Sequence, residues 1–167
     1  MNELEDIKQI EKVAGAYCKL LNSIDWDDKL IIAGLKEGLN KFLSNAFLSL
    51  NKKNKYKQGH YYSSEALEKV EKNDFSNLVY EHMVPKNKYI QKVCEEKAKD
   101  QKLEPEFIIE LLNKYWKIAV ITKDEDDKLN SRSMPAGWDG ENILARYEEV
   151  ELKVVRRKTS DSCSLWV

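Results

Sequence analysis

The sequence has few of the residues that build metal cages or cross-linked scaffolds. It contains three cysteines in 167 residues, Cys18, Cys94 and Cys163, and no two of them form a Cys-x-x-Cys pair. This odd, widely spaced set argues against a cysteine zinc cage and against a disulfide framework. We therefore expect reduced thiols, as in a cytoplasmic protein.

Glycine, proline and long apolar runs are also scarce. Six Gly and three Pro are too few for a glycine-rich β-barrel or a collagen-like chain. The uninterrupted apolar stretches are only a few residues long, whereas a membrane-spanning helix needs roughly 20. The first segment, MNELEDIKQIEK, is polar and acidic, unlike a secretory signal. These features predict an intracellular protein without a membrane partner.

Neither sign of charge is in surplus. The chain has 28 Lys and Arg against 29 Asp and Glu, a net charge of -1. This balance argues against a surface that is basic throughout and against a mimic that is acidic throughout. It does not exclude local patches of one charge. The sequence has no GxxxxGK[ST], GxGxxG, HExxH or GxSxG motif, so the enzyme classes built on those motifs are not indicated.

The first half has the period of amphipathic helices. Apolar residues recur every three or four positions in two stretches, interrupted by the segment 24–28, which supplies acids to cap the second helix. The stretches contain Leu4, Ile7, Ile10, Val13, Ala14, Tyr17, Leu20 and Leu21, then Ile31, Leu35, Leu39, Phe42, Leu43, Ala46, Phe47 and Leu50. Two long helices with a short link predict an antiparallel hairpin.

The second half mixes helices with short segments typical of strands. Residues 78–84 and 116–121 are rich in β-branched and aromatic residues and predict two strands. Thr122 and Glu125 have the spacing of a capping box. Periodicity and capping signals predict helices at 64–71, 87–99, 105–115, 123–130 and 143–152.

The predicted fold class is therefore α+β and predominantly helical. A long N-terminal helical hairpin is followed by a small two-stranded ββα-like element with inserted helices. The change of periodicity near residue 76 separates a helical region, 1–75, from a mixed region, 76–152, and a loose tail, 153–167. We expect one fused core rather than two independent domains, because a chain of 167 residues is close to the common size of one domain.

The strongest chemical signal is a carboxylate next to one of the two histidines. Glu81 and His82 lie near the end of the first predicted strand. The carboxylate can hold a hard divalent cation, and the neutral imidazole can take a proton from a water that attacks a phosphodiester. Asp126 and Asn130 are four residues apart on the helix predicted after the second strand, so both offer oxygen ligands from one helix face.

The segment Glu81-His82-Met83-Val84-Pro85 resembles the Asp-His-Ile-Val-Pro segment of HNH nucleases, and residues 117–130 look like their closing strand and helix. The resemblance implies that Glu81 is a metal ligand, His82 the general base, and Asn130 or Asp126 the second ligand, with Mg²⁺ or Mn²⁺ as cofactor. Glu81 replaces the commoner Asp, and the closing His of the family is absent. A purely structural interpretation is also open. Glu81 and His82 fit an ordinary strand end, and Asp126 fits the first turn of a helix, where the helix dipole favours acidic residues.

Basic residues suggest where nucleic acid would bind. Four lysines surround Tyr56, and further basic residues flank the motif or follow it, where they can contact phosphates. These candidates are Lys52, Lys53, Lys55, Lys57, His60, Lys86, Arg132 and Arg146. A solvated surface explains the same lysines, and Trp138 belongs to a loop that is either a lid or a packed turn.

Two functions from different classes follow. The first is metal-dependent hydrolysis of nucleic acid, with DNA expected ahead of RNA, in a defence or mobile-element protein of a low-GC bacterium or its phage. The second is a non-catalytic regulator or inhibitor whose helical hairpin docks on a partner. It predicts that Glu81 and His82 are satisfied structurally and lie far from Asp126 and Asn130. A homodimer through the N-terminal helices is compatible with the first.

Overall fold

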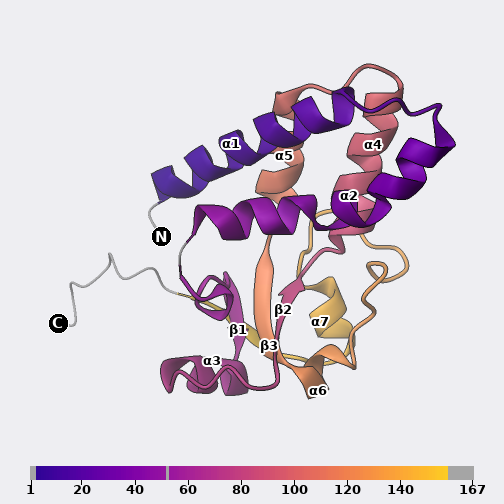
Figure 1. Ribbon diagram of the computed structural model, residues 1–167. Coiled ribbons are helices and arrows are strands. Elements are labelled where there is room, and N and C mark those ends of the chain that lie inside the picture. The colour runs from indigo at the N-terminus through magenta and orange to yellow at the C-terminus, as the bar shows by residue number, and fades with distance from the viewer. Residues whose placement is uncertain (1–2, 52, 158–167) are drawn as a thin grey trace.

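The computed structural model, which describes residues 3–51 and 53–157, begins with two long helices. Helix α1 spans Glu3–Asn22 and α2 spans Lys29–Leu50. The side chain of Asp28 caps α2 by accepting hydrogen bonds from the backbone N–H groups of Leu30 and Ile31. In Figure 1, α2 turns back beneath α1, which confirms the predicted helical hairpin.

Two further helices complete the helical layer. They are α4, Lys92–Lys99, and α5, Pro105–Tyr115, with the π-helical turn η2, Asn87–Gln91, leading directly into α4. Buried apolar residues of α1, α2, α4 and α5 form one core cluster, which includes Tyr17, Leu43 and Leu112. This core joins residues from both sides of the expected boundary at residue 76.

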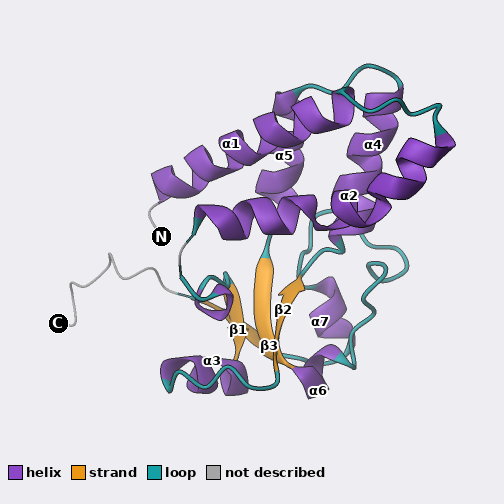
Figure 2. Cartoon of the chain, in the orientation of Figure 1, coloured by secondary structure: helices purple, strands orange, loops and turns teal. Residues whose placement is uncertain are grey.

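A four-stranded sheet lies at one end of the helical layer (Figure 2). Its strands are β1, Tyr61–Ser63, β2, Leu78–His82, β3, Ile118–Thr122, and β4, Val154–Arg156, in the order β2-β3-β1-β4. Strand β3 pairs antiparallel with β2 and parallel with β1, and β4 is antiparallel to β1.

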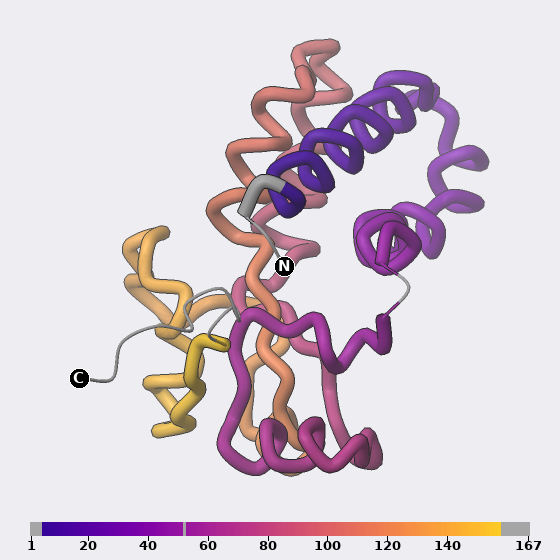
Figure 3. The backbone as a smooth tube through the Cα atoms, turned by 90° about the vertical axis from the view of Figure 1, so that its left-hand side faces the viewer, coloured from indigo at the N-terminus to yellow at the C-terminus, as the bar shows by residue number. Residues whose placement is uncertain are grey.

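Alternating side chains cover the two faces of the sheet. On one face, Tyr62 and Val120 pack with α3, Ser64–Glu71. On the other, Ala119 and Ile121 pack with Tyr147 of α7, Ala145–Glu149. Figure 3 shows the segment after β3, in orange and yellow, lying to one side of the sheet.

The structure corrects several expected elements. The sheet has four strands instead of two, because β1 and β4 are three residues long and too short to show an alternating pattern. Residues 154–156 therefore belong to a strand and not to the loose tail, whereas residues 158–167 lie outside the described part. The capping box is present, but helix α6 ends at Asp126 and α7 covers only half of 143–152.

The loop that contains Trp138 is a packed turn. The Trp138 ring lies 5.1 Å from the ring of Tyr89 and 5.7 Å from that of Tyr115, measured between centroids. The Met134 N–H donates to the Tyr89 hydroxyl at 3.1 Å. The loop is thus fixed to η2 and α5. No helix among residues 3–51 and 53–157 is both long and apolar enough to cross a bilayer.

Gly59 tests how tightly the start of β1 is packed. A Cβ at this position would lie 2.7 Å from Val120 Cγ2 and 3.0 Å from Tyr62 Cζ. We expect Gly59→Ala to destabilise the fold by about 1–3 kcal/mol through overpacking. Gly34→Ala on α2, where a Cβ meets nothing within 4 Å, should instead stabilise it by about 0.4–1 kcal/mol. Urea denaturation of both variants checks this, and equal effects would contradict it.

Candidate functional site

A basic cleft opens where β2 ends, and both residues of the sequence motif line it. Its volume is about 580 Å³. Its walls come from α2, from the end of β2, from η2 and the start of α4, and from the loop after α6. The lining residues are Asn40, Lys41, Glu81, His82, Pro85, Lys86, Asn87, Lys88, Lys92, Ser131 and Arg132.

Strand geometry turns Glu81 and His82 in different directions. The antiparallel ladder pairs Glu81 with Ala119 and His82 with Ile118, so regular pairing continues to the last residue of β2. Successive side chains of a strand point to opposite faces. Glu81 therefore faces α7, whereas His82 faces α2, and the two side chains reach the cleft from opposite sides.

Glu81 is held by a buried arginine. Arg146 Nη1 lies 2.8 Å from Glu81 Oε1 and also donates to the carbonyl oxygens of His82 at 3.0 Å and Met83 at 3.3 Å. Arg146 is 1% exposed. Burial raises the pKa of Glu81, the charge and hydrogen bond of Arg146 oppose that shift, and the negative charge of Asp126 adds to it.

The ion pair supplies the counter-charge of the buried guanidinium through Nη1 alone. Arg146 Nε and Nη2 are buried without a hydrogen-bond partner among the described residues. A buried charge that lacks its counter-ion is strongly destabilising. Arg146 was expected to clamp a phosphate, and that expectation is corrected: its side chain lies behind Glu81 and orients the carboxylate.

His82 is a neutral imidazole packed between the helical layer and the cleft. Its Nε2 lies 3.4 Å from the Ser44 hydroxyl of α2, and its ring lies 4.5 Å from the Trp116 ring, edge to face. Burial, together with the positive charges of Lys86, His60 and Arg146, lowers the pKa of His82 to about 3. At neutral pH the ring is therefore uncharged, and its Nδ1 is buried without a hydrogen-bond partner among the described residues.

Five cationic side chains surround this pair: Lys41, Lys86, Lys88, Lys92 and Arg132. Lys86 is the most constrained, because its ammonium group donates to the Asn40 carbonyl of α2, to Asn87 Oδ1 at 3.1 Å and to Gln91 Oε1 at 3.2 Å. Burial lowers the pKa of Lys86. The Glu81 carboxylate is already paired with Arg146, so the cleft favours an anion.

The expected second metal ligands are placed differently from the prediction. Asp126 ends α6, where its carboxylate lies 3.2 Å from Lys123 Nζ, and it is near enough to Glu81 to raise the pKa of that residue. Asn130 lies beyond the helix, and its Oδ1 accepts hydrogen bonds from the N–H groups of Arg132 and Ser133. Helix α6 is too short to present both side chains on one face.

The other expected nucleic-acid contacts fall into two groups. Lys86 and Arg132 line the cleft. Lys53, Lys55 and Lys57 lie in or next to the 3-10 turn η1, Lys55–Lys57, away from the cleft lining, and Lys57 Nζ is 2.6 Å from Asn73 Oδ1. Lys52 lies outside the described residues.

His60 lies half-buried just before β1, where one ring nitrogen has a structural partner, and its contact with nucleic acid stays a prediction. Its Nδ1 accepts the N–H of Ile118 at 3.1 Å. Burial, with the charges of Lys117 and Arg156, lowers the pKa of His60 to about 4.

Sequence reasoning missed the lysines on the helices. Lys88 and Lys92 are four residues apart, a spacing that puts two side chains on one helix face, and this signal was available. Lys41 gave no such signal, because its place in the cleft depends on how α2 packs against the end of β2. Among the described residues, no group of three or more His, Cys, Asp or Glu side chains is arranged to hold a metal.

Comparisons with family models, with curated proteins and with solved structures found no match to this chain.

The buried ion pair predicts a specific pattern of stability. Arg146→Met leaves the Glu81 carboxylate without its partner, so we expect a loss of about 3–5 kcal/mol in the free energy of unfolding. The double variant Glu81→Gln/Arg146→Met removes both charges and should recover much of that loss. Urea denaturation of the three proteins measures the coupling. A double variant no more stable than Arg146→Met would contradict the pairing.

The two histidines predict a loss of stability in mild acid. Their folded-state pKa values, about 3 for His82 and about 4 for His60, lie below the ordinary value of about 6.5. The unfolded state therefore binds protons first, and stability present above pH 6.5 is lost as pH falls toward 4. Each histidine contributes at most about 1.4 kcal/mol per pH unit.

Denaturation at a series of pH values between 7 and 4 measures this slope. His82→Gln removes one titrating group, so its stability should fall less steeply with pH than that of the parent protein. An unchanged slope would show that the His82 ring titrates normally in the folded protein.

Proposed function

We propose that the protein binds nucleic acid in the basic cleft and hydrolyses its phosphodiester bonds beside Glu81 and His82. The observation that carries this proposal is the convergence of a carboxylate and a neutral imidazole with five cationic side chains in one cleft. Phosphodiesters are anions, and lysine and arginine side chains supply most of the affinity of proteins for nucleic-acid backbones. DNA is the substrate we expect first.

His82 is the proposed general base. Its neutral ring accepts a proton from water while the water oxygen bonds to phosphorus and the bond to the leaving oxygen breaks. A base works best when its pKa is near the operating pH, whereas that of His82 is lowered to about 3. A bound phosphodiester brings negative charge beside the ring, and this charge raises the pKa toward neutrality.

Glu81, with Asp126 near it, is the proposed holder of a divalent metal. Arg146 occupies one oxygen of the Glu81 carboxylate and fixes its direction. Mg²⁺ is commonly bound through one or two carboxylates together with substrate phosphates and water, so two carboxylates fit this ion better than a site of three or more protein ligands. When bound, the metal supplies positive charge that stabilises the leaving oxygen.

Cleavage assays test the proposed activity. Purified protein is incubated with labelled single-stranded and duplex DNA and RNA, with Mg²⁺, Mn²⁺ or EDTA. We expect metal-dependent cleavage that falls by at least about 100-fold in His82→Ala, because a general base contributes that much or more.

Glu81→Gln should also lose activity, while Glu149→Gln, which removes an exposed carboxylate on α7, should not. Absence of cleavage with every substrate and metal, by protein that is folded by circular dichroism, would refute the proposal.

The second candidate is a non-catalytic interaction module. The ion pair of Glu81 with Arg146 and the packing of His82 against Trp116 favour it, since both motif residues have structural partners. Large apolar side chains are also exposed on the hairpin, with Leu30 82% and Ile7 45% exposed. Absence of cleavage by the folded protein would favour this second candidate.

A further inference from the structure

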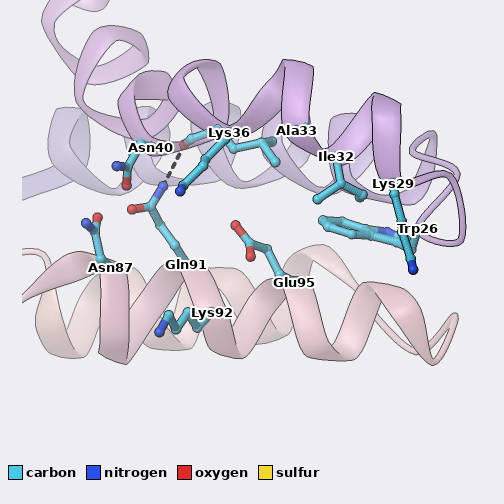
Figure 4. A pocket seen from close by; sticks show the side chains of 11 residues that line it. Trp26, Lys29, Ile32, Ala33, Lys36, Asn40, Asn87, Gln91, Lys92 and Glu95 are labelled. Atoms are coloured by element: carbon cyan, nitrogen blue, oxygen red, sulfur yellow. Dashed lines mark hydrogen bonds between the residues drawn. The ribbon is translucent and has the colours of Figure 1, made fainter.

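A second cleft continues the basic cleft along α2. It has a volume of about 620 Å³ and lies between α2 on one side and η2 with α4 on the other (Figure 4). Asn40, Asn87 and Lys92 line both clefts. The two clefts are therefore adjacent parts of one groove, which begins near Arg132 and ends at Trp26.

We propose that this groove holds one single strand of nucleic acid, whose backbone continues into the basic cleft. This inference rests on the proposed function and names its substrate class: the strand beside Glu81 and His82 is unpaired.

The charges along the groove favour a polyanion. Lys29 and Lys36 extend from α2 toward the groove, and Lys92 lies on the opposite wall (Figure 4). Lys29 and Lys36 are seven residues apart, so they are separated by about two helical turns, roughly 10 Å along α2. Glu95 is the acid among the lining residues. Lysines repeated along a narrow path suit the successive phosphates of a strand.

The polar groups inside the groove suit unpaired bases. Asn40 extends from α2 and Asn87 points toward α2 from below (Figure 4). The amide of Gln91 is not free for a base, because it donates to the Leu39 carbonyl and accepts from Lys86. Side-chain amides donate and accept hydrogen bonds in the way that base edges require. Ile32 and Trp26 add an apolar wall at the far end, against which a base ring can pack.

The size of the groove distinguishes a single strand from a duplex. Volumes of about 300–1,000 Å³ are typical of sites for small ligands, and each of the two clefts falls in that range, at about 620 and 580 Å³. A duplex exposes its bases only as edges within its grooves. An unpaired strand can enter a narrow cleft and bring a base edge to Asn40 or Asn87.

Binding in EDTA tests the inference separately from cleavage. The probes are fluorescein-labelled oligothymidine and oligouridine of about 12 nucleotides, and a DNA hairpin duplex of similar length, measured by fluorescence anisotropy over a salt series. We expect both single strands to bind more tightly than the hairpin. Lys29→Gln/Lys36→Gln should weaken single-strand binding and reduce the salt slope by about 1.4, or about 0.7 for each phosphate that a lysine no longer neutralises.

The matched control is Lys8→Gln/Lys12→Gln, which removes the same two charges from exposed positions of α1 and should leave the salt slope unchanged. Equal loss in both double variants, tighter binding of the hairpin, or no binding of either single strand would overturn the inference. If the protein cleaves nucleic acid and the Lys29 and Lys36 changes do not affect cleavage, the single-strand groove is refuted but the proposed hydrolysis is not. If single-strand binding depends on these lysines but the protein cleaves nothing with any metal, the groove is supported and the proposed hydrolysis is refuted.

Discussion

The guanidinium of Arg146 joins the end of β2 to α7, and the geometry of the site depends on it. One Nη1 atom contacts the Glu81 carboxylate and the carbonyl oxygens of His82 and Met83. These contacts fix the point at which the chain leaves the sheet and turns toward Pro85. Without them, a buried carboxylate and two strand-end carbonyls would lose a shared donor, and the base of the cleft would lose its fixed shape.

The cleft assembles side chains from segments that are distant in the sequence. Lys41 comes from α2, Lys86 and Lys88 from the turn after β2, and Arg132 from the loop after α6. The Tyr89 hydroxyl accepts from the Met134 N–H and holds this loop close to η2. Local positive charge thus coexists with a net charge of -1, because folding gathers lysines that the chain keeps apart.

The sequence predicted those features that local chemistry controls. The hairpin, the Asp28 cap and the capping box at Thr122 are present, and the strand predicted at 78–84 is present over 78–82, since each depends on neighbouring residues. The three-residue strands, the short α6 and the partner of Glu81 were not predictable in this way. Arg146 lies 65 residues from Glu81, and only the packing of α7 on the sheet brings them together.

The π-helical turn at Asn87–Gln91 decides which side of α4 forms the groove wall. In this turn, the Lys92 N–H bonds to the carbonyl of Asn87, five residues back, so the turn holds one residue more than an α-helix needs. Each residue advances a helix by about 100°. Without the extra residue, the rest of α4 would be rotated by that angle, turning Lys92 and Glu95 from the groove and moving Cys94 out of the core.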